Sequence, residues 1–276
     1  MRTVVDVGLH DGSDTAYYLH RGCRVVAVDA DPAAIEAARA RFPEPLAEGR
    51  LTLVHAGVAE REGSATFWLH PRRPAWNSFS REIASREDAD PRPILVPCRP
   101  FRDILAEHGP ADFIKIDIEG HDLLCVRDLP RHGPPGVVSA EHNGPETFDA
   151  LEAAGYREFL VLDQVCFVPL GEPYARRRAR HAELRRRLGS RRLADRLRNR
   201  LEGWARLEAE LDAFRRQGDW TFPDGASGPL PEELPADAWA PRNEAEASLV
   251  EAQVALAHAG TDPYTVWFDV VARRPA

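Results

Sequence analysis

The sequence predicts an α/β protein with a doubly wound, mostly parallel sheet and a helical, arginine-rich insertion before its last strand. Two observations lead to this fold class. In residues 1–170, short apolar segments alternate with segments of helical pattern, which is the order of parallel βαβ units. Residues 174–216 then carry 15 arginines against 6 acidic residues, and their apolar residues recur at helical spacing.

The predicted elements follow in order along the chain. A turn from Gly8 to Gly12 leads into the first helix, with Ser13 as its expected N-cap, and Pro32 takes the first position of the second helix. The expected strands are residues 2–7, 24–28, 51–55, 65–69, 94–97, 113–118, 137–141, 156–162 and 264–272. The expected helices are residues 13–21, 32–42, 101–108, 121–129, 146–154 and 244–259, besides those within 174–216.

These elements divide the chain into a core of residues 1–170, a helical insertion of residues 171–262, and a last strand within residues 263–276 that completes the core sheet. No apolar run approaches the roughly 20 residues of a membrane helix. The N-terminal residues resemble a strand and not a secretory signal. We therefore expect a cytoplasmic protein without a membrane span.

Charge and cysteine content exclude further classes. The formal net charge of the 276 residues is -8, which gives no reason to expect nucleic acid as a partner. The cysteines form no CxxC pair, which favours buried thiols over disulfides or a zinc knuckle. They are Cys23, Cys98, Cys125 and Cys166.

A glycine-containing turn follows the first strand, in the run Asp6-Val7-Gly8-Leu9-His10-Asp11-Gly12. Glycine lets a backbone approach a ligand closely. Asp29 ends the second strand, where a carboxylate can accept hydrogen bonds from both hydroxyls of a ribose. Together these features predict an adenosine-containing ligand, and a plain turn with a solvated Asp29 is the alternative.

The second candidate element is the run of residues 113–120, which begins as a strand. Lys115, Asp117 and Glu119 share one face of this strand if it extends to Glu119. Unpaired buried charges cost several kcal/mol, so these groups must pair with one another or with a ligand. Lys115 is the only lysine of the chain, which favours a role for a compact ammonium; a structural pair with Asp117 is the alternative. After the next strand, His142 is either a general base or a polar surface residue.

On these residues the chain resembles the FkbM-type family of S-adenosylmethionine (SAM) methyltransferases. The most specific run is Ile114-Lys115-Ile116-Asp117-Ile118-Glu119-Gly120, and the resemblance covers residues 3–165 and the terminal strand. Other matching residues are Asp6-Val7-Gly8 to Gly12, Asp29, Val58-Ala59-Glu60 with Gly63, Trp76-Asn77-Ser78, Val96-Pro97 with Asp103, Glu141 and Gly155-Tyr156. Leu9-His10, Asp29 and Asp122 stand where the family usually has Ala-Asn, Glu and Glu.

The resemblance implies a seven-stranded, Rossmann-like class I methyltransferase sheet with an antiparallel last strand. It implies a SAM site at the carboxyl ends of the first strands, formed by Asp6, Gly8, His10, Gly12, Asp29, Ala30, Ala56, Gly57, Val58 and Asp117. The expected base for the acceptor hydroxyl is His142, with Asp117 and Glu119 as rivals and Lys115 beside them. A divalent metal on Asp117, Glu119 and Glu141 is a less favoured alternative.

The expected function is therefore O-methylation of a small molecule or a sugar. The arginine-rich segment is either a solvated helical face or a lid that attracts an anionic acceptor, such as a phosphorylated sugar. An NAD-dependent oxidoreductase and a non-catalytic scaffold for an anionic partner are the alternatives. Asp29 suits either nucleotide, whereas the Gly8-xxx-Gly12 spacing and the lysine-containing run favour SAM.

Overall fold

The structure is a computed structural model that describes residues 1–129, 135–164, 167–171, 215–223, 225–258 and 267–274. The chain divides into two compact units, which are described one after the other. The first comprises Met1–Glu158 with Val270–Ala276, and the second comprises Phe159–Asp269. The arginine-rich helices expected before Arg215, and Cys166, lie outside the described residues.

The first unit is built on parallel strands in the order β8-β7-β1-β2-β3. In chain order they are β1 (Thr3–Val7), β2 (Arg24–Asp29), β3 (Leu51–His55), β7 (Phe113–Ile116) and β8 (Val137–Glu141). Val5 of β1 pairs with Val26 on one side and with Ile114 on the other. The order therefore reverses beside β1, and such a reversal is where α/β sheets bind ligands, at the carboxyl ends of the strands.

Helices cover this sheet in two sets. They are α1 (Ser13–His20), α2 (Pro32–Arg41), α3 (Pro43–Ala47), α5 (Phe101–His108), α6 (Asp122–Asp128) and α7 (Glu146–Ala153). Helix α1 packs on β1 and β2, α2 and α3 lie along β3, and α6 packs on α5, α7 and β8. One set is α1, α2 and α3, and the other is α5, α6 and α7. Right-handed crossovers run in opposite directions from β1 and therefore place the two sets on opposite faces of the sheet. Tyr17, Ile114 and Phe148 are buried in this core.

The helix starts are partly as predicted. Asp31 caps α2, because its carboxylate accepts a hydrogen bond from the N–H of Ala33 at 2.8 Å. The prediction for α1 is wrong by one residue: Gly12, with φ of 76°, holds the N-cap position, and no side chain caps the helix. The short helix α3 after Pro43 is not among the predicted elements.

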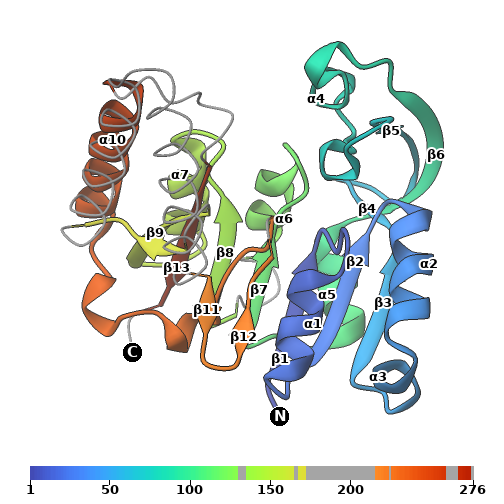
Figure 1. The fold of residues 1–276 in the computed structure, drawn as a ribbon, viewed down its shortest axis with the longest axis horizontal. Helices are drawn as coiled ribbons and strands as arrows, with labels where there is room; N and C mark the ends of the chain where they lie inside the picture. Colours follow the sequence, from blue (N-terminus) through green and yellow to red (C-terminus); the bar gives the residue numbers. More distant parts are fainter. Residues whose placement is uncertain (130–134, 165–166, 172–214, 224, 259–266, 275–276) are drawn as a thin grey trace, which may run out of the picture. The chain divides into compact units, whose positions relative to one another are not determined.

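A separate small sheet lies beyond the carboxyl ends of β2 and β3 (Figure 1). Its strands are β4 (Gly57–Val58), β6 (Arg92–Arg99) and β5 (Gly63–Leu69), in that order. Between β5 and β6 the chain forms η1 (Pro74–Trp76), α4 (Arg81–Ala84) and η2 (Arg86–Asp88). The two strands predicted here are present. Phe67, Val96 and Cys98 form the core of this sheet.

The second unit contains β9 (Glu158–Asp163) except its first residue. It also contains β10 (Val168–Pro169), β11 (Arg216–Gln217), β12 (Trp220–Thr221), η4 (Pro231–Glu233), η5 (Ala236–Ala238) and α10 (Arg242–His258). The predicted helix to Arg216 is wrong at its end, because Arg216 pairs with Thr221 in the β11–β12 hairpin. Gly218, with φ of 60°, turns this hairpin.

The central sheet has eight strands, in the order β10-β9-β13-β8-β7-β1-β2-β3, and not the expected seven. The additional strand is β10, which pairs antiparallel with β9. The last strand, β13 (Phe268–Arg273), is antiparallel to β9. The N–H groups of Arg157 and Gln164 donate to the carbonyls of Arg273 and Trp267, in opposite chain order.

The other composition-based expectations concern cysteines and membranes. Cys23, Cys98 and Cys125 are buried free thiols, as predicted. Within the described ranges, no helix combines the length and the apolar character needed to cross a bilayer.

Candidate functional site

The turn after β1 is fixed by backbone geometry that requires glycine. The N–H of Gly8 donates to the carbonyl of Val28 at 2.9 Å. Gly8 has φ of 93°, and a Cβ placed on it would lie 1.8 Å from the carbonyl oxygen of Asp117. Gly12 also has a positive φ, and a Cβ there would lie 2.9 Å from the ring of Phe42. The turn therefore brings the ends of β1 and β7 closer than any side chain allows.

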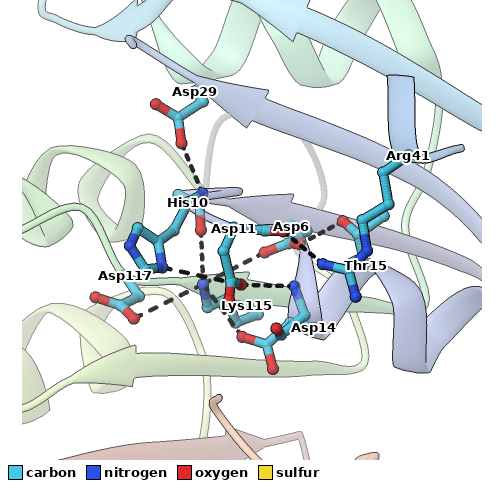
Figure 2. Close-up of polar contacts among 11 residues, drawn as sticks. Asp6, His10, Asp11, Asp14, Thr15, Asp29, Arg41, Lys115 and Asp117 are labelled. Carbon is cyan, nitrogen blue, oxygen red and sulfur yellow. Dashed lines mark hydrogen bonds and ion pairs between the residues drawn. The ribbon is translucent and has the colours of Figure 1, made fainter. Parts of the chain in front are cut away.

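A buried lysine is surrounded by carboxylates beneath this turn (Figure 2). The ammonium of Lys115 donates to the carbonyl of Gly8 at 2.9 Å. It lies 3.3 Å from Asp6 Oδ1, 3.6 Å from Asp14 Oδ2 and 3.7 Å from Asp117 Oδ2. The side chain of Lys115 is 3% exposed, so these ion pairs are largely shielded from water. Four of the predicted site residues, Asp6, Gly8, Lys115 and Asp117, thus lie together.

Among the described residues, this cluster contains three carboxylates and one ammonium. Asp6 and Asp14 are buried, and Asp117 is partly exposed. Thr15 donates from Oγ1 to Asp6 Oδ2 at 2.6 Å. Asp6 Oδ1 has no hydrogen-bond partner within the described part of the chain, although the ammonium of Lys115 is near. A cationic or hydrogen-donating group at this edge would complement the cluster.

Asp29, at the end of β2, is held by two backbone bonds. Its Oδ2 accepts from the N–H of His10 at 2.8 Å, and its Oδ1 accepts from the N–H of Asp31 at 2.8 Å. Burial raises the pKa of Asp29 to about 6, against the lowering effect of these two bonds. The imidazole of His10 lies beside Asp11 instead, with Nδ1 3.9 Å from Oδ1. The backbone of His10, more than its ring, therefore belongs to the Asp29 site.

The segment after β3 lies next to Asp29. The N–H of Ala56 donates to the carbonyl of Asp29 at 3.0 Å. Ala30 and Val58 are buried. A Cβ on Gly57 would lie 2.2 Å from the ring of Phe79, so this glycine is covered closely by the segment between β5 and β6. The predicted adenine-side residues are therefore adjacent in the structure.

The segment after β7 differs from the prediction. Strand β7 ends at Ile116, and Glu119 has φ of 48°, so Glu119 does not continue the face of Lys115 and Asp117. Ser78 donates from Oγ to the carbonyl of Glu119 at 2.9 Å, and Arg86 donates to its Oε2 at 3.1 Å. Burial raises the pKa of Glu119 to about 7, aided by Asp117 and opposed by Arg86.

A hydrogen-bond network joins this segment to the end of β8. Asp122 accepts from the N–H groups of Ile118 and Gly120 at 3.1 and 3.2 Å, and from the side chain of Asn143 at 3.0 Å. Burial raises the pKa of Asp122 to about 6. His142 precedes Asn143 and is half-buried, with its ring 6.0 Å from that of Phe148.

Several contacts of the site were not found by sequence reasoning. In the first turn of α1, Asp14 contacts Lys115 and Thr15 contacts Asp6. The sequence feature that could have predicted these contacts is their position directly after the glycine-containing turn. Asn77 donates to Asp31 Oδ2 at 2.9 Å. Together with Ser78, Asn77 ties the segment between β5 and β6 to the carboxyl edge of the main sheet. The described residues contain no group of three or more His, Cys, Asp or Glu arranged for a metal ion.

One comparison with known proteins identifies a family. A family model described as "Methyltransferase FkbM domain" matches residues 6–188. No curated protein matches the chain. Among solved structures, a TehB-like SAM-dependent methyltransferase from Corynebacterium glutamicum is 12% identical, over 58% of this chain and 68% of that chain, with a TM-score of 0.32.

Two further solved structures are similar at the same level. The O-methyltransferase from Bacillus cereus in complex with SAH is 16% identical over 59% of this chain and 67% of that chain, with a TM-score of 0.34. A phosphoethanolamine N-methyltransferase 2 from Haemonchus contortus in complex with S-adenosyl-L-methionine is 11% identical over 100% of this chain and 49% of that chain, with a TM-score of 0.39.

Proposed function

Because this chain belongs to the FkbM family of methyltransferases, we propose that it transfers a methyl group from SAM to a hydroxyl of a small molecule or a sugar. When bound, SAM supplies a methyl group on a positively charged sulfur. The observation that carries the proposal is the excess of carboxylates around Lys115. In the described part of the chain, the carboxylates of Asp6, Asp14 and Asp117 lie within 3.3–3.7 Å of the Lys115 ammonium, so a cationic ligand would be favoured beside them and an anionic ligand would be repelled.

The residues at the turn fit this cofactor. SAM carries a sulfonium and an α-ammonium, and either group would offset the charge of the cluster. Asp6 is buried, and its Oδ1 lies 3.3 Å from the ammonium of Lys115. The carboxylate of Asp117 is 37% exposed and is the member of the cluster that a ligand can reach. We therefore assign Asp6, Gly8, His10, Gly12 and Asp117 to the methionine side of the cofactor.

The adenosine side is assigned to the ends of β2 and β3. Each oxygen of the Asp29 carboxylate accepts one backbone N–H and keeps a second lone pair for a ribose hydroxyl. Ala30, Gly57 and Val58 lie at the same edge and would border the adenine. The pyrophosphate of NAD, in contrast, would bring two negative charges to the turn beside three carboxylates. This electrostatic difference favours SAM over the dinucleotide.

The acceptor hydroxyl has to lose a proton as its oxygen attacks the methyl group, and a positioned base assists this step. Glu119 suits the task, because its pKa of about 7 lies near neutral pH and its side chain is 21% exposed. His142 and Asp117 are the other candidates. Lys115 holds Gly8 and the carboxylates in place. Most of the rate enhancement would come from alignment of the two reactants.

Calorimetric titration of the full chain with SAM, S-adenosylhomocysteine (SAH) and NAD, with and without magnesium, tests the proposal. We expect micromolar binding of SAM and SAH, lost in Asp29→Ala and retained in the control Asp90→Ala, whose side chain is exposed. Binding of NAD alone would transfer the chain to the oxidoreductases. Binding of SAM without turnover on any hydroxylated acceptor would support a scaffold, and magnesium-dependent binding would support a metal site.

A further inference from the structure

The segment between β5 and β6, residues 70–88, gathers arginines over aromatic rings. The guanidinium carbons of Arg73 and Arg86 lie 4.8 and 5.7 Å from the ring centroid of Trp76. Arg81 lies over Trp68 in the same way, at 5.1 Å. Cation–π contacts of this kind fix the position of a long, otherwise mobile side chain.

Trp76 is itself held firmly. His70 is buried and packs edge-on against Trp76, with 5.2 Å between the ring centroids. Nδ1 of His70 accepts from the N–H groups of Arg72 and Arg73, and its Nε2 lies 3.1 Å from the carbonyl of Arg86. The backbones that carry the arginines around Trp76 are therefore tied to one buried imidazole.

These arginines are next to the proposed base. Arg86 donates to Glu119 Oε2 at 3.1 Å, and Ser78 of the same segment donates to the carbonyl of Glu119. Since Glu119 follows β7, the arginine-bearing segment is fixed directly to the loop where the acceptor hydroxyl would be deprotonated.

The charges around Trp76 leave an excess of cations. Glu87 lies 2.9 Å from Arg73 and 4.0 Å from Arg72, and Glu119 pairs with Arg86. Three guanidiniums thus share two carboxylates. Residues 70–88 as a whole carry four arginines and three acids, so it is the local arrangement, and not the overall charge of the segment, that favours an anion.

Both carboxylates also sit on unusual backbone. Glu87 has φ of 56° and Glu119 has φ of 48°, in the left-handed region that L-residues other than Asn and Asp seldom adopt. Such conformations persist where the surrounding structure imposes them, and they concentrate at ligand sites. The arginines around Trp76 remain accessible, with side chains of Arg72, Arg73 and Arg86 exposed by 61%, 54% and 36%.

We propose that Arg73 and Arg86, held over Trp76, bind a phosphate group carried by the methyl acceptor. A guanidinium has five N–H donors in a planar fork, and such forks match phosphate oxygens well. Arg86 has further N–H donors besides the one that it directs to Glu119, so it can bind a phosphate while it keeps that bond, and it would hold the acceptor beside the carboxylate of Glu119. This inference rests on the proposed methyltransferase function and names the class of its acceptor, a hydroxylated phosphomonoester.

The test follows the indole N–H signals by two-dimensional NMR in the SAH-saturated full chain at low salt. The probes are inorganic phosphate, glucose 6-phosphate, glucose, and vesicles with or without phosphatidic acid. We expect saturable shifts with the phosphate-bearing probes and none with glucose. Arg73→Gln and Arg86→Gln should each weaken binding about tenfold or more, whereas Arg39→Gln, an exposed arginine paired with Glu36 on α2, should stay within about twofold.

Each outcome bears on the proposal. Equal phosphate affinity in all variants, or no shift in a chain that still binds SAH, would overturn it and leave the proposed function intact. A wild-type chain that binds neither SAM nor SAH would overturn the function itself. Saturation by glucose 6-phosphate supports a soluble acceptor, and saturation by phosphatidic acid alone supports a lipid one. If Arg86→Gln does not fold, Arg86→Lys keeps the charge without the fork and should still weaken binding several-fold.

Discussion

Replacement of Lys115 by methionine is expected to destabilise the first unit strongly. Methionine has a similar length and no charge, so the substitution removes the ammonium without a large change in volume. Three carboxylate oxygens at 3.3–3.7 Å then lose the positive charge of the ammonium, and two of the carboxylates, those of Asp6 and Asp14, are buried. Breaking a buried ion pair from one side costs about 3–5 kcal/mol, which is a large part of the roughly 5–15 kcal/mol that stabilises a typical domain.

The loss should depend on pH with a definite sign. In the variant, the folded state relieves the carboxylate repulsion by taking up a proton that the unfolded chain releases near pH 4. The folded state then binds more protons than the unfolded state, so the free energy of unfolding falls as pH rises. The deficit relative to wild type is therefore larger at pH 7.5 than at pH 5.

Urea denaturation at both pH values, followed by tryptophan fluorescence, measures this effect. Arg39→Met is the matched control, because it removes an exposed cation paired with Glu36 and should cost less than about 0.5 kcal/mol. A loss below about 1 kcal/mol in Lys115→Met at pH 7.5, or a loss equal at both pH values, would refute the idea that Lys115 compensates buried carboxylates.

Three further predictions follow from the same unit. Gly8→Ala should abolish SAH binding and lower the free energy of unfolding by several kcal/mol, because the added Cβ meets the Asp117 carbonyl. The control is Gly22→Ala, since Gly22 also has a positive φ but no atom lies within 4 Å of an added Cβ. It should cost about 1 kcal/mol of stability and leave the calorimetric affinity for SAH unchanged. Glu119 holds its proton to about pH 7 when folded, so its contribution to the free energy of unfolding should fall by up to about 3 kcal/mol between pH 4.5 and 7.5. Glu119→Gln should remove this contribution from the urea-derived profile and leave those of Asp29 and Asp122, whose pKa values burial also raises. Ser78→Ala should cost about 1–3 kcal/mol in thermal and urea unfolding, because it leaves the Glu119 carbonyl without its donor; an unchanged midpoint would contradict this.

The parts of the site that sequence predicted are those governed by strand geometry. Asp6, Lys115 and Asp117 converge because β1 and β7 are adjacent parallel strands, with Asp6 paired with Lys115. Asp29 lies at the same edge of the sheet, because β2 pairs in parallel with β1 on the side opposite to β7. Carboxyl ends of parallel strands meet at one edge, and apolar runs with acidic ends are enough to identify them.

The parts that sequence did not predict depend on backbone turns and long-range contacts. The positive φ of Glu119 ends the alternation that would have placed it beside Asp117. Ser78 reaches Glu119 from 41 residues away, and Asn77 reaches Asp31 from 46 residues away. No local pattern encodes such pairings, because they arise from the way the small sheet packs on the main one.

The single lysine of the chain now has a physical explanation. Its ammonium approaches the Gly8 carbonyl at 2.9 Å and three carboxylates at 3.3–3.7 Å, a convergence that suits a compact, rotatable group with three donors and not a planar guanidinium. The same ammonium fixes the carbonyl of the glycine that lets β1 approach Asp117. Cation, glycine and carboxylates therefore depend on one another: an arginine at position 115 would displace the turn, and a side chain at position 8 would displace Asp117 from the ammonium.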